Sequence, residues 1–412
     1  MRDKADRPAA PSSRVANVAS YGLVIGAVLL AWQMVIQPFV QRAPVEAAIR
    51  LAPGSPLVLR RAAESELTAG RVENAAALSR DALARSPFDA RALRVVGLTE
   101  ARAGRDDEAD EMLTLAGNWS LRDDPTHAWL VERRLRSGNY ASAFAHADTL
   151  VRRREDIQPQ VFRLFTVAGV EDPQRSLGVL ANLLSTRPPW RGAFISTLNQ
   201  TPEELQLFAG LAILLEACPS PLNNTELRFL YLTLLDNRQF EAIRTVRERI
   251  NRPPPGIAVT NGGFADASAP DPFQWQFIPK AGIRAEIVDD DIRASNQALR
   301  VDYDGYASGT VTEQLTSLTP GAYRFTAEVR TETGDPNARL AWTLTCAADG
   351  RALATVPAGA SGVAQGGWTN LSAQVEVPGS CPAQWLRLET RAGDRKNPTI
   401  AWFDRITLSP IS

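Results

Sequence analysis

The chain has 412 residues and a formal net charge of −1, from 45 lysines and arginines against 46 aspartates and glutamates. Hydrophobic residues make up 44%, so the chain is expected to fold, and its length suggests two or three domains of roughly 100–200 residues. The balanced charge argues against a strongly basic, polyanion-binding protein. With 2 histidines and 3 cysteines, histidine-based zinc sites and cysteine-rich metal modules are nearly ruled out.

An apolar segment near the N-terminus predicts a transmembrane anchor over residues 18–40. As a helix, its part 19–39 would extend roughly 31 Å, enough to cross a hydrocarbon core of about 30 Å. More basic residues precede the segment than closely follow it, so the positive-inside rule places residues 1–17 in the cytoplasm and the rest outside. A cleaved signal peptide is the alternative interpretation of this segment.

Residues 44–252 predict an all-α solenoid of helix-turn-helix repeats, because the chain repeats with a period of 34. Two sets of small residues keep this spacing: Gly70, Gly104 and Gly138, and Ala75, Ala109 and Ala143. Each glycine separates two helical apolar patterns and permits a tight turn, and the alanines let the two helices approach closely. The pattern weakens after residue 155, although five further segments still predict helices: 161–168, 174–184, 203–217, 226–236 and 240–250.

These repeats resemble the tetratricopeptide repeat. The resemblance rests on the turn glycines and helix alanines together with Gly97, Ala82, Ala116 and Pro87. The tryptophan of the family's first helix is absent, because Leu59, Leu93 and His127 stand in its place. The resemblance implies a scaffold whose concave face docks other proteins.

A proline-rich linker is expected at residues 253–256, because three consecutive prolines cannot continue a helix. Over residues 257–412 the periodicity changes to short alternating segments between turn residues, such as 298–303 and 323–329. Many short strands at such spacing predict an antiparallel jelly-roll sandwich. The expected fold class is therefore multidomain: one transmembrane helix, an all-α solenoid and an all-β sandwich.

The order of residues in 257–412 resembles carbohydrate-binding jelly rolls of families four, nine and twenty-two. The segments that carry the resemblance are Asn261 to Phe264 (NGGF), Leu318 to Arg330 (LTPGAYRFTAEVR) and Ala401 to Leu408 (AWFDRITL). The closing pair of aspartates in the family is only half present, as Asp404 followed by Arg405, which weakens any transfer of its calcium site. The resemblance implies glycan binding.

Two of the three cysteines, Cys346 and Cys381, lie in the predicted sandwich. Outside the cytoplasm they are free to form a disulfide, which would stabilise the domain by about 3–4 kcal/mol on the chain-entropy model. Two buried thiols are the alternative. The remaining Cys218 is expected to be an unpaired core thiol.

No catalytic constellation is expected, so the chain is predicted not to be an enzyme. His127 and His146 lie on different predicted helices without an evident acid partner and nucleophile, and are expected to be structural. The acidic run 289–291 is expected to be a solvated loop, with a structural calcium ion as the minor alternative. No other cofactor and no nucleic-acid partner are predicted.

Sugar binding by such folds uses outward-facing aromatic rings and polar groups that fix hydroxyls. Trp385 is the main candidate, because it alternates with the core positions Leu386 and Leu388. The full candidate set is Trp385, Arg387, Glu389, Arg324, Glu328, Phe403 and Tyr306, and the other sandwich tryptophans, Trp275, Trp342, Trp368 and Trp402, are expected in the core. Packing of Trp385 against the solenoid is the alternative.

The sequence as a whole predicts a single-pass protein of the bacterial inner membrane with its C-terminal bulk in the periplasm. Its solenoid would dock other envelope proteins, and its sandwich would bind or position an envelope polysaccharide. A structural assembly factor whose sandwich meets only protein is the alternative, and a glycan-processing enzyme is the third hypothesis.

Overall fold

The computed structural model describes residues 23–28, 31, 38, 40–250, 258–265, 269–294, 296–334, 339–358, 366–393 and 396–411. The predicted cytoplasmic tail, most of the predicted anchor and the proline-rich linker lie outside these residues. Within them, no helix combines the length and apolar character needed to cross a membrane. The chain divides into two compact units, Met1–Arg153 and Arg154–Ser412, which are described separately.

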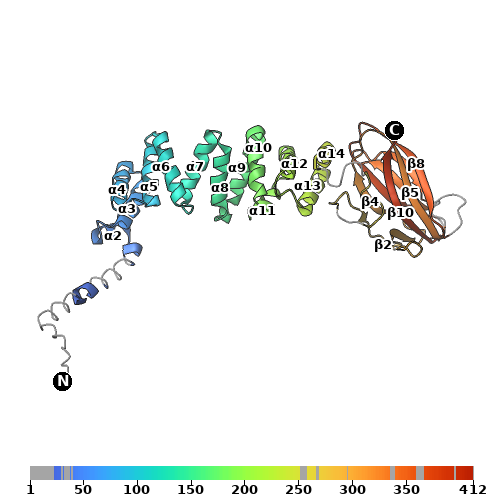
Figure 1. Ribbon diagram of the computed structural model, residues 1–412, viewed down its shortest axis with the longest axis horizontal. Coiled ribbons are helices and arrows are strands. Elements are labelled where there is room, and N and C mark those ends of the chain that lie inside the picture. Colours follow the sequence, from blue (N-terminus) through green and yellow to red (C-terminus); the bar gives the residue numbers. More distant parts are fainter. Residues whose placement is uncertain are drawn as a thin grey trace, which may run out of the picture. The chain divides into compact units, whose positions relative to one another are not determined.

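The first unit is a series of paired helices (Figure 1). Its helices are α2 (Val45–Leu51), α3 (Pro56–Thr68), α4 (Val72–Arg85), α5 (Ala90–Arg102), α6 (Asp106–Trp119), α7 (Asp124–Arg136) and α8 (Tyr140–Val151). Gly70, Gly104 and Gly138 lie at the turn inside each pair from α3 to α8, with φ of 79°, 76° and 66°. Only glycine adopts this left-handed conformation without steric cost, which explains its recurrence every 34 residues.

The alanines of the repeat lie where the helices of a pair meet. Ala75, Ala109 and Ala143 are fully buried. A Cβ on Gly97 of α5 would lie 2.7 Å from Cγ of Leu113 in α6, so this pair also needs a residue without a side chain. The predicted pairing of helices is therefore confirmed in this unit.

The second unit begins with further helices: η1 (Glu155–Ile157), α9 (Gln158–Glu171), α10 (Pro173–Ser185), α11 (Arg191–Ile195), α12 (Pro202–Glu216), α13 (Asn224–Asp236) and α14 (Phe240–Ile250). Capping boxes start α12 and α13, where Thr201 pairs with Glu204 and Asn223 with Glu226. These signals are local, which explains why the segments predict helices although the 34-residue pattern has faded.

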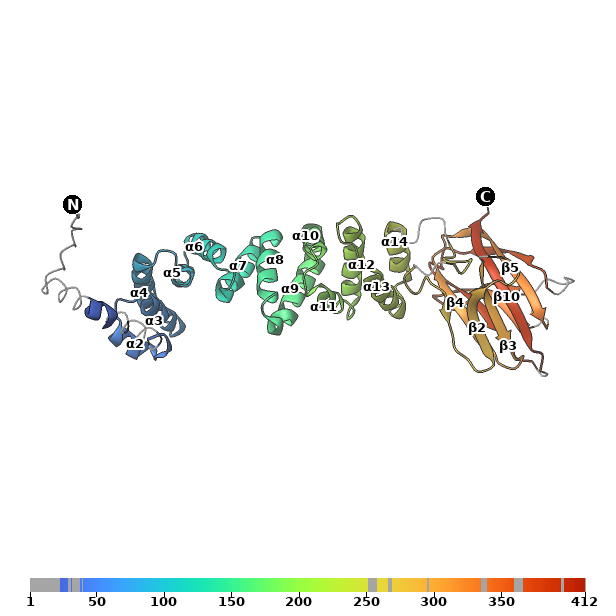
Figure 2. The ribbon, with the colours of Figure 1, turned by 60° about the horizontal axis from the view of Figure 1, so that its bottom comes forward.

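The unit continues into a sandwich of two five-stranded antiparallel sheets (Figure 1, Figure 2). Sheet A has the order β1-β4-β9-β6-β7, and sheet B has the order β2-β3-β10-β5-β8. The strands are β1 (Gln276–Phe277), β2 (Ile283–Asp289), β3 (Gln297–Tyr303), β4 (Gly309–Thr316), β5 (Gly321–Thr333), β6 (Leu340–Cys346), β7 (Ala352–Pro357), β8 (Thr369–Val377), β9 (Gln384–Thr390) and β10 (Thr399–Pro410). The predicted sandwich is confirmed.

The inner faces of the two sheets enclose one aromatic core. Trp342 lies at its centre, with the rings of Trp275, Phe325 and Phe403 at centroid distances of 5.8, 6.0 and 5.6 Å. Its indole N–H is buried and has no hydrogen-bond partner among the described residues. Trp275 and Trp342 therefore occupy the core positions that the sequence predicts for them.

The outward orientation predicted for Phe403 is wrong. Phe403 is 0% exposed and belongs to the core, whereas Trp402 lies on the outer face of sheet B, so the core position expected for Trp402 is wrong as well. The reason is a bulge in β10, where the pairing with β5 shifts between Asp404 and Thr407 and Arg405 adopts a φ of 50°. An extra residue reverses the alternation, so Ala401, Phe403 and Ile406 all point inward. The core position expected for Trp368 is also wrong, because its ring is part-exposed and lies 4.5 Å from the guanidinium of Arg293.

Candidate functional site

A pocket of about 390 Å³ lies in the second unit, between its last two helices and the sandwich. Its lining comes from separate parts of the chain: Leu235, Arg238, Phe240, Ala347, Ala348, Asp349, Gly350 and Trp385. Trp385 belongs to β9, and residues 347–350 form the turn between β6 and β7. The pocket therefore includes the residue that sequence alternation marks as the main candidate.

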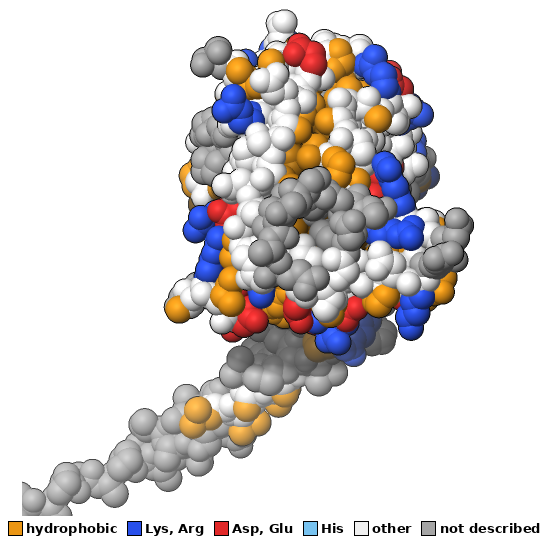
Figure 3. Space-filling view, turned by 90° about the vertical axis from the view of Figure 1, so that its right-hand side faces the viewer, with side chains coloured by type: hydrophobic (Ala, Val, Ile, Leu, Met, Phe, Trp, Pro, Cys, Tyr) orange, Lys and Arg blue, Asp and Glu red, His pale blue; other side chains and the backbone are white. Residues whose placement is uncertain are grey.

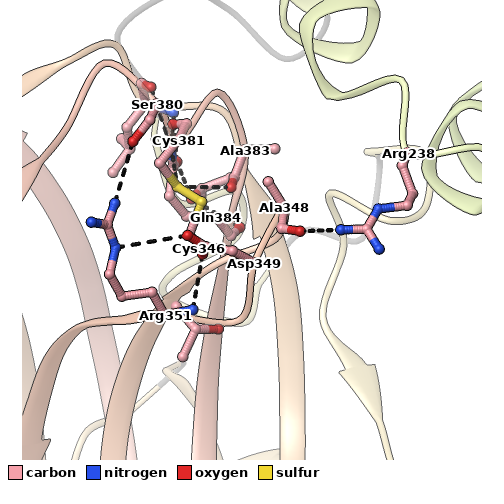
Figure 4. Close-up of a disulfide and its surroundings, with 12 residues drawn as sticks. Arg238, Cys346, Ala348, Asp349, Arg351, Ser380, Cys381, Ala383 and Gln384 are labelled. Carbon is pink, nitrogen blue, oxygen red and sulfur yellow. Dashed lines mark hydrogen bonds and ion pairs between the residues drawn. A yellow bond between two sulfur atoms is a disulfide. The ribbon is translucent and has the colours of Figure 1, made fainter.

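The β6–β7 turn is a rigid wall of this pocket. A disulfide joins Cys346, directly before the turn, to Cys381, with a Cα–Cα distance of 5.6 Å (Figure 4). Within the turn, the amide of Gly350 donates to the carbonyl of Cys346 at 2.8 Å, and the amide of Ala347 donates to the carbonyl of Ala383 at 2.9 Å. Disulfide and backbone bonds together fix the turn beside Trp385.

Arg238 lies in the opposite wall of the pocket, and its side chain bonds to the β6–β7 turn. It follows α13 with a left-handed φ of 57°, and its side chain reaches across to donate a hydrogen bond to the carbonyl of Ala348 (Figure 4). The segment that leads into the sandwich also contacts α13: Arg228 pairs with Asp271 at 2.9 Å, and the rings of Tyr231 and Phe273 meet at 4.8 Å. These contacts hold both walls of the pocket in place.

Trp385 lies on the outer face of sheet A beside Arg387, whose charge is neutralised by an ion pair. The guanidinium of Arg387 lies 5.2 Å from the centroid of the Trp385 ring and pairs with Glu313 at 2.7 Å. Leu315, opposite Trp385 on β4, is fully buried, so this end of the face is apolar. Trp385 itself is only half-buried, which leaves part of its ring at the pocket.

The structure gathers three of the seven predicted sugar-binding residues on one face. Trp385, Arg387 and Glu389 alternate along β9 on the outer face of sheet A. Arg324 and Glu328 lie on β5 in the other sheet, and Tyr306, 52% exposed, follows β3. With Phe403 in the core, these seven residues do not form a single site.

Sequence reasoning missed the pocket residues that α13, α14 and the turn between them contribute, namely Leu235, Phe240 and Arg238. Nothing in the local pattern of α13 and α14 distinguishes them from ordinary positions of a helix pair. They reach the pocket because segments more than a hundred residues apart lie side by side, which no local periodicity records.

The outer face of sheet B offers no open aromatic platform around Trp402. Although Trp402 faces outward, it is only 5% exposed, because the guanidinium of Arg330 lies 4.2 Å from its ring centroid. Arg330 also pairs with Asp291 at 2.6 Å and lies 3.7 Å from Asp290. The acidic run 289–291 is thus engaged with an arginine, and no group of three metal-ligating side chains is found in the described part of the chain.

Charges of both signs are mixed on the sandwich surface. Figure 3 shows the end of the molecule formed by the sandwich, where blue and red side chains alternate around the rim and orange side chains surface in its upper half. This face carries no extended basic field, in agreement with the net charge of −1. Any recognition of an anion by this domain therefore requires a local site.

The C-terminal sandwich resembles solved carbohydrate-binding modules. A structure described as "CBM4 structure and function" is 14% identical, with 37% of this chain and 99% of that one covered and a TM-score of 0.28. The CBM22-1 xylan-binding domain of Paenibacillus barcinonensis Xyn10C is 15% identical over 34% and 86% of the two chains, with a TM-score of 0.26.

A third solved structure, TmCBM61 in complex with β-1,4-galactotriose, is 15% identical over 38% of this chain and 99% of that one, with a TM-score of 0.26. At these identities the similarity concerns the fold alone. A comparison with protein-family models gives no match, and no curated protein matches the chain.

Proposed function

We propose that the sandwich binds a polysaccharide in the pocket beside Trp385, while the paired helices carry the sandwich and dock partner proteins. The observation that carries the proposal is the presence of a half-buried indole ring in the pocket wall. Ligand pockets commonly occupy about 300–1,000 Å³ and combine apolar surface with a few polar groups. This pocket fits that description, because it combines Trp385 and Phe240 with Arg238 and Asp349.

The chemistry of the lining suits a sugar ring. The C–H faces of a pyranose pack against an indole, and its hydroxyls need donors and acceptors at the edge of the ring. Arg238 supplies donors, Asp349 supplies acceptors, and the turn 347–350 supplies backbone groups. The disulfide fixes this turn, which lowers the entropy cost of ordering the site on binding.

The proposed role is not catalytic. Glycoside hydrolysis in most families needs two carboxyl groups on either side of the scissile bond. Among the residues that line the pocket, Asp349 is the single carboxylate, and it lies 3.9 Å from the guanidinium of Arg351. The lining therefore supports holding a glycan rather than cleaving it.

An exposed apolar patch supports the docking of partner proteins by the helices of the first unit. Phe88, after α4, is 83% exposed, and its ring meets that of Trp119, at the end of α6, at 5.6 Å. Leu121 is exposed in the adjoining turn. Exposed apolar patches on soluble surfaces commonly mark protein contacts.

The glycan proposal is tested with the full chain in detergent against a panel of bacterial and plant polysaccharide fragments. Binding is measured by calorimetry, and Trp385→Ala is expected to weaken it at least 10-fold. Trp119→Ala is the matched control, because it removes a partly exposed tryptophan outside the sandwich. Trp385→Phe should retain part of the affinity, since a smaller aromatic ring remains.

Equal binding by the Trp385→Ala protein, or no binding across the panel, would contradict the proposal. In that case the contacts of the sandwich with α13 and α14, such as Tyr231 with Phe273, favour the alternative of a purely structural assembly factor. Loss of protein partners from extracts on Phe88→Ser, with glycan binding unchanged, would support the docking role of the patch.

A further inference from the structure

Two arginines stand opposite each other at the far end of the outer face of sheet A. Arg339 directly precedes β6 and Arg391 directly follows β9, and the amide of Arg391 donates to the carbonyl of Arg339 at 2.8 Å. The neighbouring pair in the register is Leu340 with Thr390, so the two arginines are cross-strand partners. Like charges directly opposite each other in a sheet are destabilising unless a counter-charge lies nearby.

Within the described residues, neither guanidinium pairs with a carboxylate. The Nε of Arg339 is buried and has no hydrogen-bond partner there. Both arginines line a small pocket with Leu340, Ala341, Thr355 and Pro357. Its volume of about 80 Å³ is room for a carboxylate-sized group, given about 30 Å³ per water molecule.

The position of the Arg339 guanidinium depends on a glycine. A Cβ on Gly393 would lie 1.8 Å from Nη1 of Arg339 and 2.0 Å from its Cζ. Any other residue at this position would therefore displace the guanidinium. The absence of a side chain at Gly393 therefore leaves room for the guanidinium of Arg339, which lines the small pocket together with Arg391.

The arginine pair lies on the same face as Trp385. Trp385, Arg387, Glu389 and Arg391 follow one another at alternate positions of one strand and its end. At about 3.3 Å per residue, Trp385 and Arg391 are about 20 Å apart along the strand. Arg387 between them is neutralised by Glu313, and Glu389 forms no ion pair within the described residues, so it is available to accept hydrogen bonds from hydroxyls.

We propose that Arg339 and Arg391 form an anion subsite for the carboxylate of a uronic acid, so that the ligand is an acidic polysaccharide lying along β9. The proposal rests on the proposed function, because it extends the site at Trp385. Paired guanidinium groups bind a carboxylate through several charge-assisted hydrogen bonds, and the bound anion also removes the repulsion between them. Trp385 supplies ring packing at one end, and the arginines select for charge at the other.

The test compares acidic tetrasaccharides with their carboxyl-reduced, neutral counterparts on the full chain in detergent. The probes are tetramers of galacturonate, mannuronate, guluronate and glucuronate, each as the acid and as the reduced sugar. At least one acid is expected to bind 10-fold or more tightly than its reduced counterpart. The preference should shrink as ionic strength rises, because salt screens an exposed ion pair.

Three variants test whether the two arginines cause the preference for acidic over neutral sugars. Arg339→Gln and Arg391→Gln should each remove most of it and leave affinity for the neutral sugar within about two-fold. Gly393→Ala keeps every charge but displaces the Arg339 guanidinium, so it should reduce the preference as well. Arg284→Gln, an exposed arginine on sheet B, is the matched control and should leave the preference unchanged.

Equal affinity for acidic and neutral sugars, with binding still dependent on Trp385, would overturn the anion subsite and leave the proposed function standing. A preference that survives both Arg391→Gln and Gly393→Ala would also overturn it. Arg391 is exposed, so its substitution tests the proposal even if Arg339→Gln impairs folding. Absence of binding to every tetramer would instead overturn the proposed function, and the subsite with it.

Discussion

At the scale of single residues, the histidine pair of the first unit shows how burial fixes a protonation state. Nδ1 of His127 lies 3.0 Å from Nδ1 of His146, and Nε2 of His127 lies 3.2 Å from the carbonyl of Ser120. Because a carbonyl only accepts, neutral His127 carries its proton on Nε2, and its Nδ1 accepts from His146. Burial lowers the pKa of His127, and burial together with His127 lowers the pKa of His146 to about 4.

The pair predicts that acid destabilises the first unit. Protonation of His127 on Nδ1 would place two Nδ1–H donors against each other, and protonation of His146 would put a charge into a part-buried site. Both pKa values lie below the unfolded value of about 6.5, so the stabilisation is complete above pH 6.5 and is lost as the pH falls towards 4. Allowing for solvent screening, a loss on the order of 1–2 kcal/mol is expected in urea unfolding.

The variant His146→Gln checks this assignment, because an amide keeps a donor for His127 and removes one titrating group. Since the chain has 2 histidines, no further imidazole titrates in this pH range, and the carboxylates that begin to titrate near pH 4 are common to the variant and the wild type. The free energy of unfolding of the His146→Gln variant should depend less on pH between 6.5 and 4 than that of the wild type. A wild-type profile that is flat over this range would contradict the prediction.

At the scale of elements, the bulge in β10 determines which side chains reach the core. Arg405 adopts a φ of 50° there, a conformation that glycine tolerates and a β-branched residue does not. Arg405→Val is therefore expected to destabilise the sandwich by about 1–3 kcal/mol, whereas Arg405→Gly should be close to neutral. Denaturant unfolding of both variants measures the difference.

The control for the bulge is Arg284→Val, on the regular strand β2, where a β-branched residue should be neutral or stabilising. The ion pair of Arg405 with Glu328 is exposed and contributes little, so its loss is common to both variants at position 405. Equal stability of the two Arg405 variants would show that the bulge imposes no backbone requirement.

The close packing of the paired helices depends on small residues at their contacts. Ala109 of α6 is fully buried in a cluster with Leu113 and Leu130. Ala109→Trp should therefore lower the unfolding free energy by about 1–3 kcal/mol or more through overpacking. Glu111→Trp adds the same volume at an exposed position of the same helix, and an equal effect of the two substitutions would argue against the close contact at Ala109.

At the scale of the whole molecule, the proposed orientation rests on the charge before residues 18–40. Four basic residues precede this segment, namely Arg2, Lys4, Arg7 and Arg14. A reporter that is active only in the periplasm, fused after Ser412, should therefore be active in a bacterial host. Activity of a cytoplasm-specific reporter at the same position would refute the orientation and remove the main support for an envelope location.

The sequence by itself determined the elements whose causes are local. Glycines at a period of 34 set the turns of the helix pairs, capping residues started α12 and α13, and alternation in Tyr323 to Val329 marked a core strand. The same alternation placed Trp385 on an outer face. These features follow from bonding and packing within a few residues, so a single sequence records them.

Only the tertiary structure decided what depends on distant segments. The bulge at Arg405 adds one residue to β10 relative to β5, so that both Phe403 and Ile406 point into the core although strict alternation would place them on opposite faces. The pocket at Trp385 exists because α13 and α14 meet the β6–β7 turn, and the arginine pair exists because β6 and β9 are neighbours in sheet A. Such sites arise from contacts between residues far apart in the chain, and local periodicity carries no information about them.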